Sequence, residues 1–250
     1  MLTRFPFLRS VSLDRGAVRS FTRYPFSLSI AHHLAGESLA FHPQVTFLVG
    51  ENGSGKSTLL EALAVKCDFP AEGGSKNVAV KTHDLPTPLA DALRLERGAT
   101  RADDGFFLRA ESFFNYASEM DREGHDMRWY GGRSLHAQSH GEAFFNLFMQ
   151  RFFGGGLYFL DEPEAALSPM RQMAMLARLK QLNETGSQFI IATHSPILMA
   201  YPHAKIVQFT EDEVREVEWR ETEHFYVTQQ FLNAPERMLK TLLGNDTAEE

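Results

Sequence analysis

The stretch Gly50-Glu51-Asn52-Gly53-Ser54-Gly55-Lys56-Ser57-Thr58 decides the fold of this chain. It fits the P-loop pattern G-x-x-x-x-G-K-[ST], whose glycines let backbone N–H groups come close to a phosphate. The apolar run at residues 45–49 precedes it and predicts a buried strand, and residues 59–64 follow it with the composition of a helix. A strand, a glycine-rich turn and a helix N-terminus in this order predict a site for nucleotide phosphates.

The residues of this loop have separate expected roles. Lys56 would add positive charge at the β- and γ-phosphates, and the Ser57 hydroxyl would be a ligand of Mg²⁺. The alternative is a glycine-rich turn that binds no ligand, which the flanking strand and helix disfavour. Tyr24, Phe26 or Phe41 could stack on the base, although such aromatic residues more often belong to a core. The remaining contacts to the nucleotide are expected from Gly50, Asn52, Gly53, Ser54, Gly55 and Thr58.

The bulk properties favour one α/β domain. The chain has 250 residues, a net charge of -7 and a single cysteine, Cys67. We expect one α/β domain over residues 1–250 with a helical and loop lobe inserted at 71–138. One cysteine excludes an internal disulfide and fits a reducing cytoplasm. No apolar run approaches the roughly 20 residues that span a bilayer, so no membrane insertion is expected.

Two further strand ends carry residues suited to phosphate chemistry. Asp161 and Glu162 follow the apolar run at 157–160, and their side chains should point in opposite directions because strand side chains alternate. We expect Asp161 to hold Mg²⁺, directly or through water, and Glu162 to orient or deprotonate the attacking water. His194 ends the next buried run, where a histidine can hydrogen-bond a γ-phosphate. The alternatives are an acidic strand end at the surface and a structural histidine.

Strands and helices alternate along the rest of the chain. This alternation predicts an α/β P-loop fold with a mostly parallel central sheet, an antiparallel edge and a small helical insertion. Ser139 and Glu142 have capping-box spacing, which alone could explain both residues. The expected strands are a hairpin of 25–30 with 37–41, a strand at 106–110 and a hairpin of 205–209 with 214–219. The expected helices span 89–97, 143–153, 168–183 and 223–243, and the last of them is broken at 233–235.

Five motifs in this order resemble the ATP-binding-cassette (ABC) superfamily. The resemblance spans residues 26–207, and the sequence around 109–115 and 161–169 looks most like soluble bacterial AAA-type predicted ATPases related to RecF and SMC heads. After the P-loop, or Walker A motif, the positions of the signature, Walker B, D-loop and H-loop motifs are Ser139-His140-Gly141-Glu142, Leu160-Asp161-Glu162-Pro163, Ala166-Leu167-Ser168-Pro169 and Thr193-His194.

The resemblance implies a head-to-tail homodimer with two ATP molecules at its interface. Ser139 and Gly141, at the start of the signature helix, would contact the γ-phosphate held by the other subunit. His140 stands where the family has its first signature glycine, Ser168 replaces the usual D-loop aspartate, and no glutamine occupies the Q-loop region. Glu111 could take the place of this glutamine as a neighbour of the γ-phosphate or Mg²⁺. The alternative is that Glu111 is an ordinary residue on the surface of a loop.

The function that the resemblance implies is Mg²⁺-dependent hydrolysis of ATP to ADP and phosphate in the cytoplasm. Glu162, Lys56 and His194 would be its catalytic residues. We expect a dimerisation switch in DNA maintenance or cellular defence, with an unidentified protein partner; the alternatives are the nucleotide-binding subunit of an ABC transporter and an ATP-sensing module with negligible turnover. Arginines within 15–23 and 94–109 could line a groove for nucleic acid or could simply be solvated.

Overall fold

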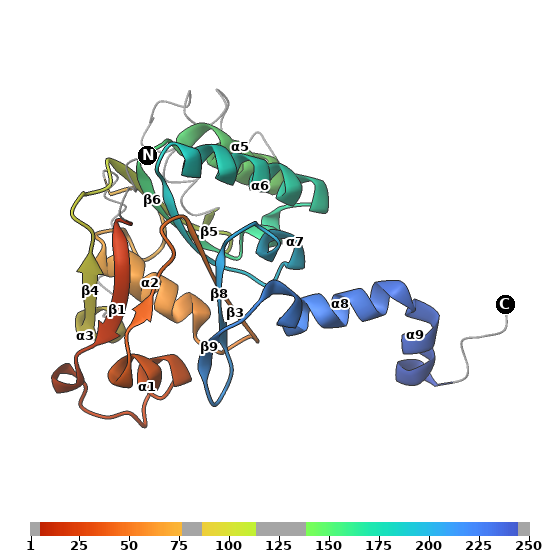
Figure 1. The fold of residues 1–250 in the computed structure, drawn as a ribbon, viewed down its shortest axis with the longest axis horizontal. Helices are drawn as coiled ribbons and strands as arrows, with labels where there is room; N and C mark the ends of the chain where they lie inside the picture. The colour runs from red at the N-terminus through yellow and green to blue at the C-terminus, as the bar shows by residue number, and fades with distance from the viewer. Residues whose placement is uncertain (1–5, 77–86, 114–138, 245–250) are drawn as a thin grey trace.

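A six-stranded sheet forms the centre of the protein. We describe it from a computed structural model, which covers residues 6–76, 87–113 and 139–244 (Figure 1). Five of the strands are parallel and the sixth, β9, pairs antiparallel at one edge, as the sequence predicted. In spatial order the strands are β5 (Asp104–Arg109), β6 (Gly156–Asp161), β7 (Gln188–Ala192), β3 (Val45–Gly50), β8 (Lys205–Phe209) and β9 (Val214–Glu216).

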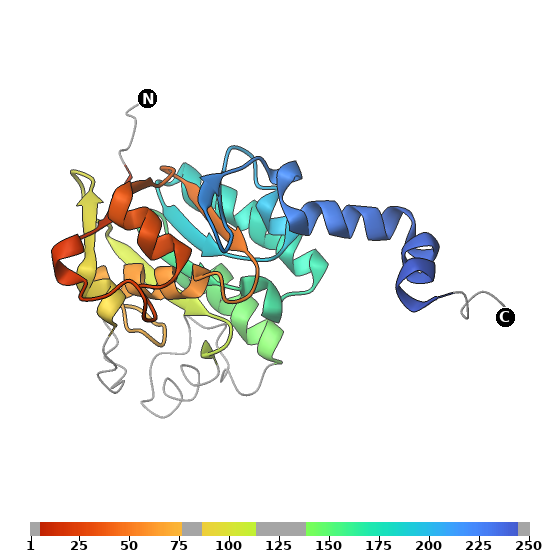
Figure 2. The ribbon, with the colours of Figure 1, turned by 90° about the horizontal axis from the view of Figure 1, so that it is seen from below.

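Each face of this sheet carries its own hydrophobic cluster. Along β3, Leu48 belongs to one cluster, whereas Phe47 and Val49 belong to the other, because successive strand side chains alternate. Helix α2 (Lys56–Lys66) covers the first face, and α5 (His140–Arg151) and α6 (Pro169–Glu184) lie together over the second (Figures 1 and 2). Apolar residues on both faces explain why the strand segments read as continuous hydrophobic runs.

A smaller antiparallel sheet lies beside α2 and corrects the predicted N-terminal hairpin. Its strands are β2 (Leu39–Ala40), β1 (Leu8–Leu13) and β4 (Leu93–Arg97), in that order. The strand expected at 25–30 is wrong: the chain enters helix α1 (Ser29–Gly36), whose Ile30, Ala31 and Leu34 are buried. Apolar residues at these spacings lie on one helical face, which outweighed the short alternation before them.

The helix expected at 89–97 is only half correct. A five-residue helix, α3 (Pro88–Ala92), gives way directly to β4. Within β4, Leu93 and Leu95 are the more buried residues and Arg94 and Glu96 are exposed, so the period is two rather than 3.6. The lobe predicted at 71–138 includes residues 77–86 and 114–138, which lie outside the described part of the chain, and it stays a prediction.

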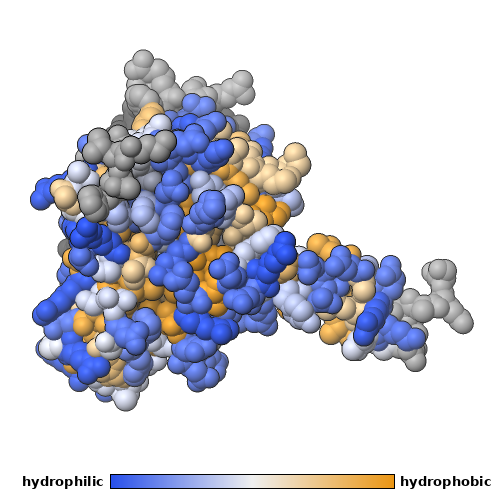
Figure 3. All heavy atoms as spheres, viewed as in Figure 1, coloured by the Kyte–Doolittle hydropathy of each residue, from blue (hydrophilic) through white to orange (hydrophobic). Residues whose placement is uncertain are grey.

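Two helices at the C-terminal end project from the body. The predicted hairpin of β8 and β9 is confirmed, and so is the pair of helices broken near Pro235: α8 (Glu223–Asn233) and α9 (Pro235–Leu243). Figures 1 and 2 show both helices extending away from the sheet, and Figure 3 shows apolar residues on their surface. Neither helix contains a buried residue. In the described ranges, no helix is both long and apolar enough to cross a bilayer.

Candidate nucleotide-binding site

The P-loop lies at the carboxyl end of β3, in the middle of the sheet. Gly50 has a φ of 141°, and a Cβ there would lie 2.2 Å from the carbonyl oxygen of Phe209 on the neighbouring strand. Gly55 has a φ of 98° and precedes the first turn of α2. Both positions therefore require glycine, the first for close approach to β8 and the second for its left-handed backbone. The first N–H groups of an α-helix have no partner within the helix, so the start of α2 offers donors to an anion.

Lys56 lies inside this loop. Its Nζ donates hydrogen bonds to the carbonyl oxygens of Gly50 and Glu51, both at 2.8 Å, so the side chain holds the shape of the turn. Burial is the main cause that lowers the pKa of Lys56, and the nearby carboxylates of Glu162 and Asp161 oppose it. The hydroxyl oxygen of Ser54 is buried without a hydrogen-bond partner in the described structure. A phosphate oxygen in the loop would supply that partner.

Ser57 and Asp161 meet at the base of the loop. Ser57 Oγ donates a hydrogen bond to Asp161 Oδ1 at 2.8 Å, joining α2 to the end of β6. Burial raises the pKa of Asp161, whereas the bond from Ser57 and the guanidinium of Arg109 lower it. Within the described ranges, His, Cys, Asp and Glu form no group of three that could hold a metal ion. Two oxygen donors still fit Mg²⁺, which commonly takes one or two protein oxygens together with phosphates and water.

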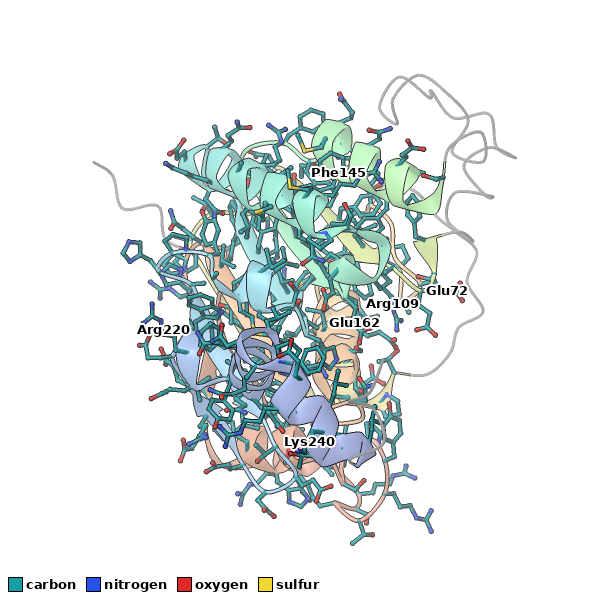
Figure 4. The ribbon with its side chains drawn as sticks, turned by 90° about the vertical axis from the view of Figure 1, so that its right-hand side faces the viewer. Glu72, Arg109, Phe145, Glu162, Arg220 and Lys240 are labelled. Carbon is teal, nitrogen blue, oxygen red and sulfur yellow. The ribbon has the colours of Figure 1, made fainter. Side chains whose placement is uncertain are left out.

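Glu162 and His194 lie next to this pair of oxygens. Glu162 has a left-handed backbone, with φ 49° and ψ 50°, and its N–H donates to the carbonyl of Ala192 on β7. The His194 Nε2 and Glu162 Oε1 atoms are 3.6 Å apart. Figure 4 looks onto this region from the side of the C-terminal helices, with Glu162 and Arg109 labelled near its centre. The predicted catalytic carboxylate and histidine are therefore neighbours in space.

Three charged or polar residues of the site were not predicted for it. Arg109, at the end of β5, places Nε 3.4 Å from Asp161 Oδ2 and bonds Glu61 through Nη1 at 2.7 Å. Glu164 is buried, which raises its pKa, and it accepts the N–H of His194 at 2.5 Å. His224 reaches His194 from α8, with 2.8 Å between its Nε2 and Nδ1 of His194. Arg109 and Glu164 flank recognisable motifs, whereas nothing in the sequence marks His224.

Glu111 and the candidate base-stacking residues have different surroundings. Glu111 is exposed in the turn after β5, so its role in place of a Q-loop glutamine stays a prediction. Phe41 is 6% exposed and belongs to the core, as its alternative stated. Tyr24 is 71% exposed, and its hydroxyl lies 3.1 Å from Thr58 Oγ1 at the P-loop helix. Phe26 is half-buried and packs against the core, so Tyr24 is the most exposed of the three aromatic residues.

A cavity opens on the outer side of the P-loop. Its volume is about 560 Å³, within the roughly 300–1,000 Å³ of small-molecule sites. The segment 50–54 forms one wall, the start of α1 and residues 208–211 form others, and Glu223 and His224 close it from α8. The expected contacts Asn52, Gly53 and Ser54 are therefore on a surface that a ligand can reach.

Ser139 and Gly141 lie at the start of α5, where Ser139 is exposed and Gly141 is half-buried. Ser139 forms the capping box with Glu142: its Oγ accepts the N–H of Glu142 at 3.3 Å, and its own N–H donates to Glu142 Oε2 at 3.1 Å. Gly141 packs against the carbonyl of Ala166, in the turn after β6. The side-chain hydrogen bonds described for Ser139 are with Glu142 and not with the P-loop, so its expected contact with ATP of another subunit remains a proposal.

Gly141→Ala is expected to destabilise the fold by about 1–3 kcal/mol through overpacking. The cause is local, because a Cβ at Gly141 would lie 2.5 Å from the carbonyl oxygen of Ala166. Thermal unfolding measures the effect, at roughly 2–4 °C per kcal/mol for a domain of this size. Gly36→Ala is the matched control, since a Cβ at Gly36 meets nothing within 4 Å. Equal melting temperatures for the two variants would contradict the close contact.

Two segments of the chain match known family models. Residues 21–84 match a model described as "AAA domain", and residues 136–200 match one described as "AAA domain, putative AbiEii toxin, Type IV TA system". The first segment contains the P-loop, and the second runs from the signature motif to the H-loop. A curated relative, the hemin import ATP-binding protein HmuV of Streptomyces coelicolor, is 31% identical over 195 residues, which make up 66% of this chain and 62% of that protein. The match therefore spans less than two thirds of the relative's length.

The fold of this chain is similar to that of cbiO1 from Clostridium perfringens, part of the ABC transporter complex cbiONQ. The cbiO1 structure matches this chain with a TM-score of 0.50 and 18% identity. The match covers 93% of this chain and 98% of the cbiO1 chain. The SMC head domain from Thermotoga maritima matches with a TM-score of 0.44 and 16% identity, over 84% of this chain and 98% of that one. Both family models are of AAA domains, and the likeness to cbiO1 is one of fold, so this chain resembles the P-loop ATPases of the ABC type.

Proposed function

We propose that this protein is a Mg²⁺-dependent ATPase that works as an ATP-driven dimerisation switch. The observation that carries the proposal is the 2.8 Å hydrogen bond between Ser57 Oγ and Asp161 Oδ1. It joins the P-loop helix to the end of β6 at the point where the two oxygens would hold the metal. Glu162 and His194 lie beside it, 3.6 Å apart. A module that only senses ATP needs the loop but has no need of this carboxylate and histidine.

In the proposed reaction, water attacks the γ-phosphorus and the bond to the β–γ bridging oxygen breaks, giving ADP and phosphate. Glu162 orients the water and takes its proton as the new P–O bond forms. Lys56 and the loop amides stabilise the charge that builds up on the phosphate oxygens. His194 hydrogen-bonds the γ-phosphate. Mg²⁺ held by Ser57 and Asp161 would neutralise phosphate charge and fix the orientation of its oxygens.

The proposed dimer completes each site with a second copy. The start of α5 is exposed, its capping box is formed, and a helix N-terminus favours a nearby anion by about 0.3–1 kcal/mol. Ser139 and Gly141 would therefore add to the binding of a γ-phosphate on the partner subunit. ATP would hold the two copies together, and its hydrolysis would release them.

The process that hydrolysis drives is a further part of the proposal. We favour cellular defence or DNA maintenance, because the description of the family model over 136–200 includes a toxin–antitoxin system. A transporter's nucleotide-binding subunit is the second candidate, favoured by the 31% identity to the hemin import ATP-binding protein. Arg15 bonds the carbonyl of Ala35, Arg94 pairs with Asp14 and Arg109 lies in the site. These three arginines are engaged within the chain, and a nucleic-acid groove along 15–23 and 94–109 stays an untested prediction.

Phosphate release and sizing test the proposed function together. Purified wild-type protein with ATP and Mg²⁺ should release phosphate, and chelation of Mg²⁺ should stop the release. Sizing with ATP should show a dimer that is absent without ATP. Copurification with an integral membrane protein would favour the transporter candidate. If the protein binds ATP but releases no phosphate, the proposed ATPase function is wrong and the ATP-sensing module is the function that remains.

A further inference from the structure

The first turn of α8 is attached to the loop that follows β7. His224 Nε2 and His194 Nδ1 are 2.8 Å apart, a hydrogen bond between two imidazole rings. A second connection runs beside it: the indole N–H of Trp219 donates to the carbonyl of Pro196 at 2.9 Å. Thr222 is fully buried and caps α8 by accepting the N–H of Phe225. The position of the His224 ring is therefore fixed from two sides, although α8 is exposed from Tyr226 onward.

Only one proton lies between the two facing nitrogens. Burial is the main cause that lowers the pKa of His194 and of His224, which favours the neutral form of both rings. In a neutral imidazole one nitrogen donates and the other accepts. Either His194 donates from Nδ1, which leaves its Nε2 bare, or His224 donates from Nε2, which leaves the proton of His194 on Nε2.

The surroundings of His194 Nε2 decide between these two arrangements. This nitrogen faces the carboxylate of Glu162 at 3.6 Å and is buried without a hydrogen-bond partner in the described structure. A bare nitrogen lone pair facing a carboxylate would be repelled. An N–H there is attracted to that carboxylate and can donate to a phosphate oxygen. The second arrangement, in which His224 is the donor, therefore fits the site.

We propose that His224 is a positioning residue, which holds His194 in the tautomer that carries its proton on Nε2 and so lets His194 donate to the γ-phosphate. This inference rests on the proposed ATPase function. Because the donor belongs to α8, the chemistry at the P-loop then depends on how the C-terminal helices are seated. A displacement of the first turn of α8 would remove the donor and also open the cavity beside the P-loop, which Glu223 and His224 line.

Two substitutions at His224 separate the hydrogen bond from packing. His224→Gln keeps a donor N–H near the position of Nε2, whereas His224→Leu keeps a side chain of moderate size with no donor. Gln229→Leu, at an exposed position on the same helix, is the control for a general effect on α8. We expect His224→Leu to lower kcat by about 10-fold, the size expected for one lost hydrogen bond, with little change in KM for ATP. His224→Gln and Gln229→Leu should stay close to wild type.

Nitrogen NMR of ¹⁵N-histidine-labelled wild-type protein reads the tautomer of His194 without any turnover. We expect His194 of wild-type protein to carry its proton on Nε2. His224→Gln should keep this tautomer, whereas His224→Leu should lose it or mix it with the tautomer protonated on Nδ1. A proton on Nδ1 in wild type, or a His224→Leu variant with wild-type tautomer and kcat, would overturn the inference. Failure of wild-type protein to hydrolyse ATP overturns the proposed function instead, and the NMR result still tests the tautomer.

Discussion

Glu162→Gln is expected to slow ATP turnover by about 10²- to 10⁴-fold while leaving ATP binding intact. The amide has nearly the same shape as the carboxylate but cannot take a proton from water. The backbone of Glu162 is anchored separately, because its N–H donates to the carbonyl of Ala192. The substitution should therefore leave β6 and the Ser57–Asp161 hydrogen bond in place. Single-turnover phosphate release and ATP titration calorimetry measure the two quantities.

The control for this variant is Glu184→Gln, which makes the same chemical change at an exposed position near the end of α6. It should keep wild-type turnover. Wild-type turnover in Glu162→Gln would remove Glu162 from its proposed role. A slow variant should also accumulate the ATP-bound form, so sizing of Glu162→Gln with ATP should show the proposed dimer more completely than wild type does.

Lys56→Ala is expected to weaken ATP binding by about 100-fold or more, since charge-assisted hydrogen bonds contribute about 1.5–3 kcal/mol each. The substitution also removes the two hydrogen bonds from Nζ to the carbonyls of Gly50 and Glu51, which hold the shape of the loop. Equilibrium titration with a nucleotide analogue measures the loss.

Lys66→Ala is the matched control, because Lys66 lies at the other end of the same helix. It should bind ATP as wild type does. Unchanged ATP affinity in Lys56→Ala would contradict the assignment of residues 50–58 as a phosphate-binding loop. Loss of affinity in both variants would point to damage to α2 as a whole, so the melting temperature of each variant should be measured beside its affinity.

The parts of the fold that could be predicted are those whose geometry is determined by residues close together in the sequence. Gly50 and Gly55 adopt backbone angles that the P-loop pattern anticipates. The runs that became β6 and β7 are apolar on both faces because helices cover both sides of the sheet. Ser168 caps α6 directly before a proline, as its sequence indicated. In each of these cases the signal is contained in a few consecutive residues.

The parts that could not be predicted depend on contacts between distant segments. β1 contains alternating polar residues and is recognisable only by its pairing, Leu13 with Leu93. Arg109 was read as part of a strand, but its partners Glu61 and Asp161 come from α2 and β6. His224 has no motif around it, and it contacts His194 because α8 packs with its first turn beside the loop after β7. Such contacts need the fold before they can be seen.

The position of β3 in the middle of the sheet has a consequence for how this protein is made. Val45 pairs with Phe189 and Thr46 with Lys205, so both neighbours of the strand come from the last third of the chain. On the ribosome, the apolar segment leading into the P-loop emerges long before anything can pair with its amides and carbonyls. Exposed strand edges of this kind associate readily with other chains. We therefore expect the nascent chain to need binding by chaperones until β7 and β8 have left the exit tunnel of the ribosome.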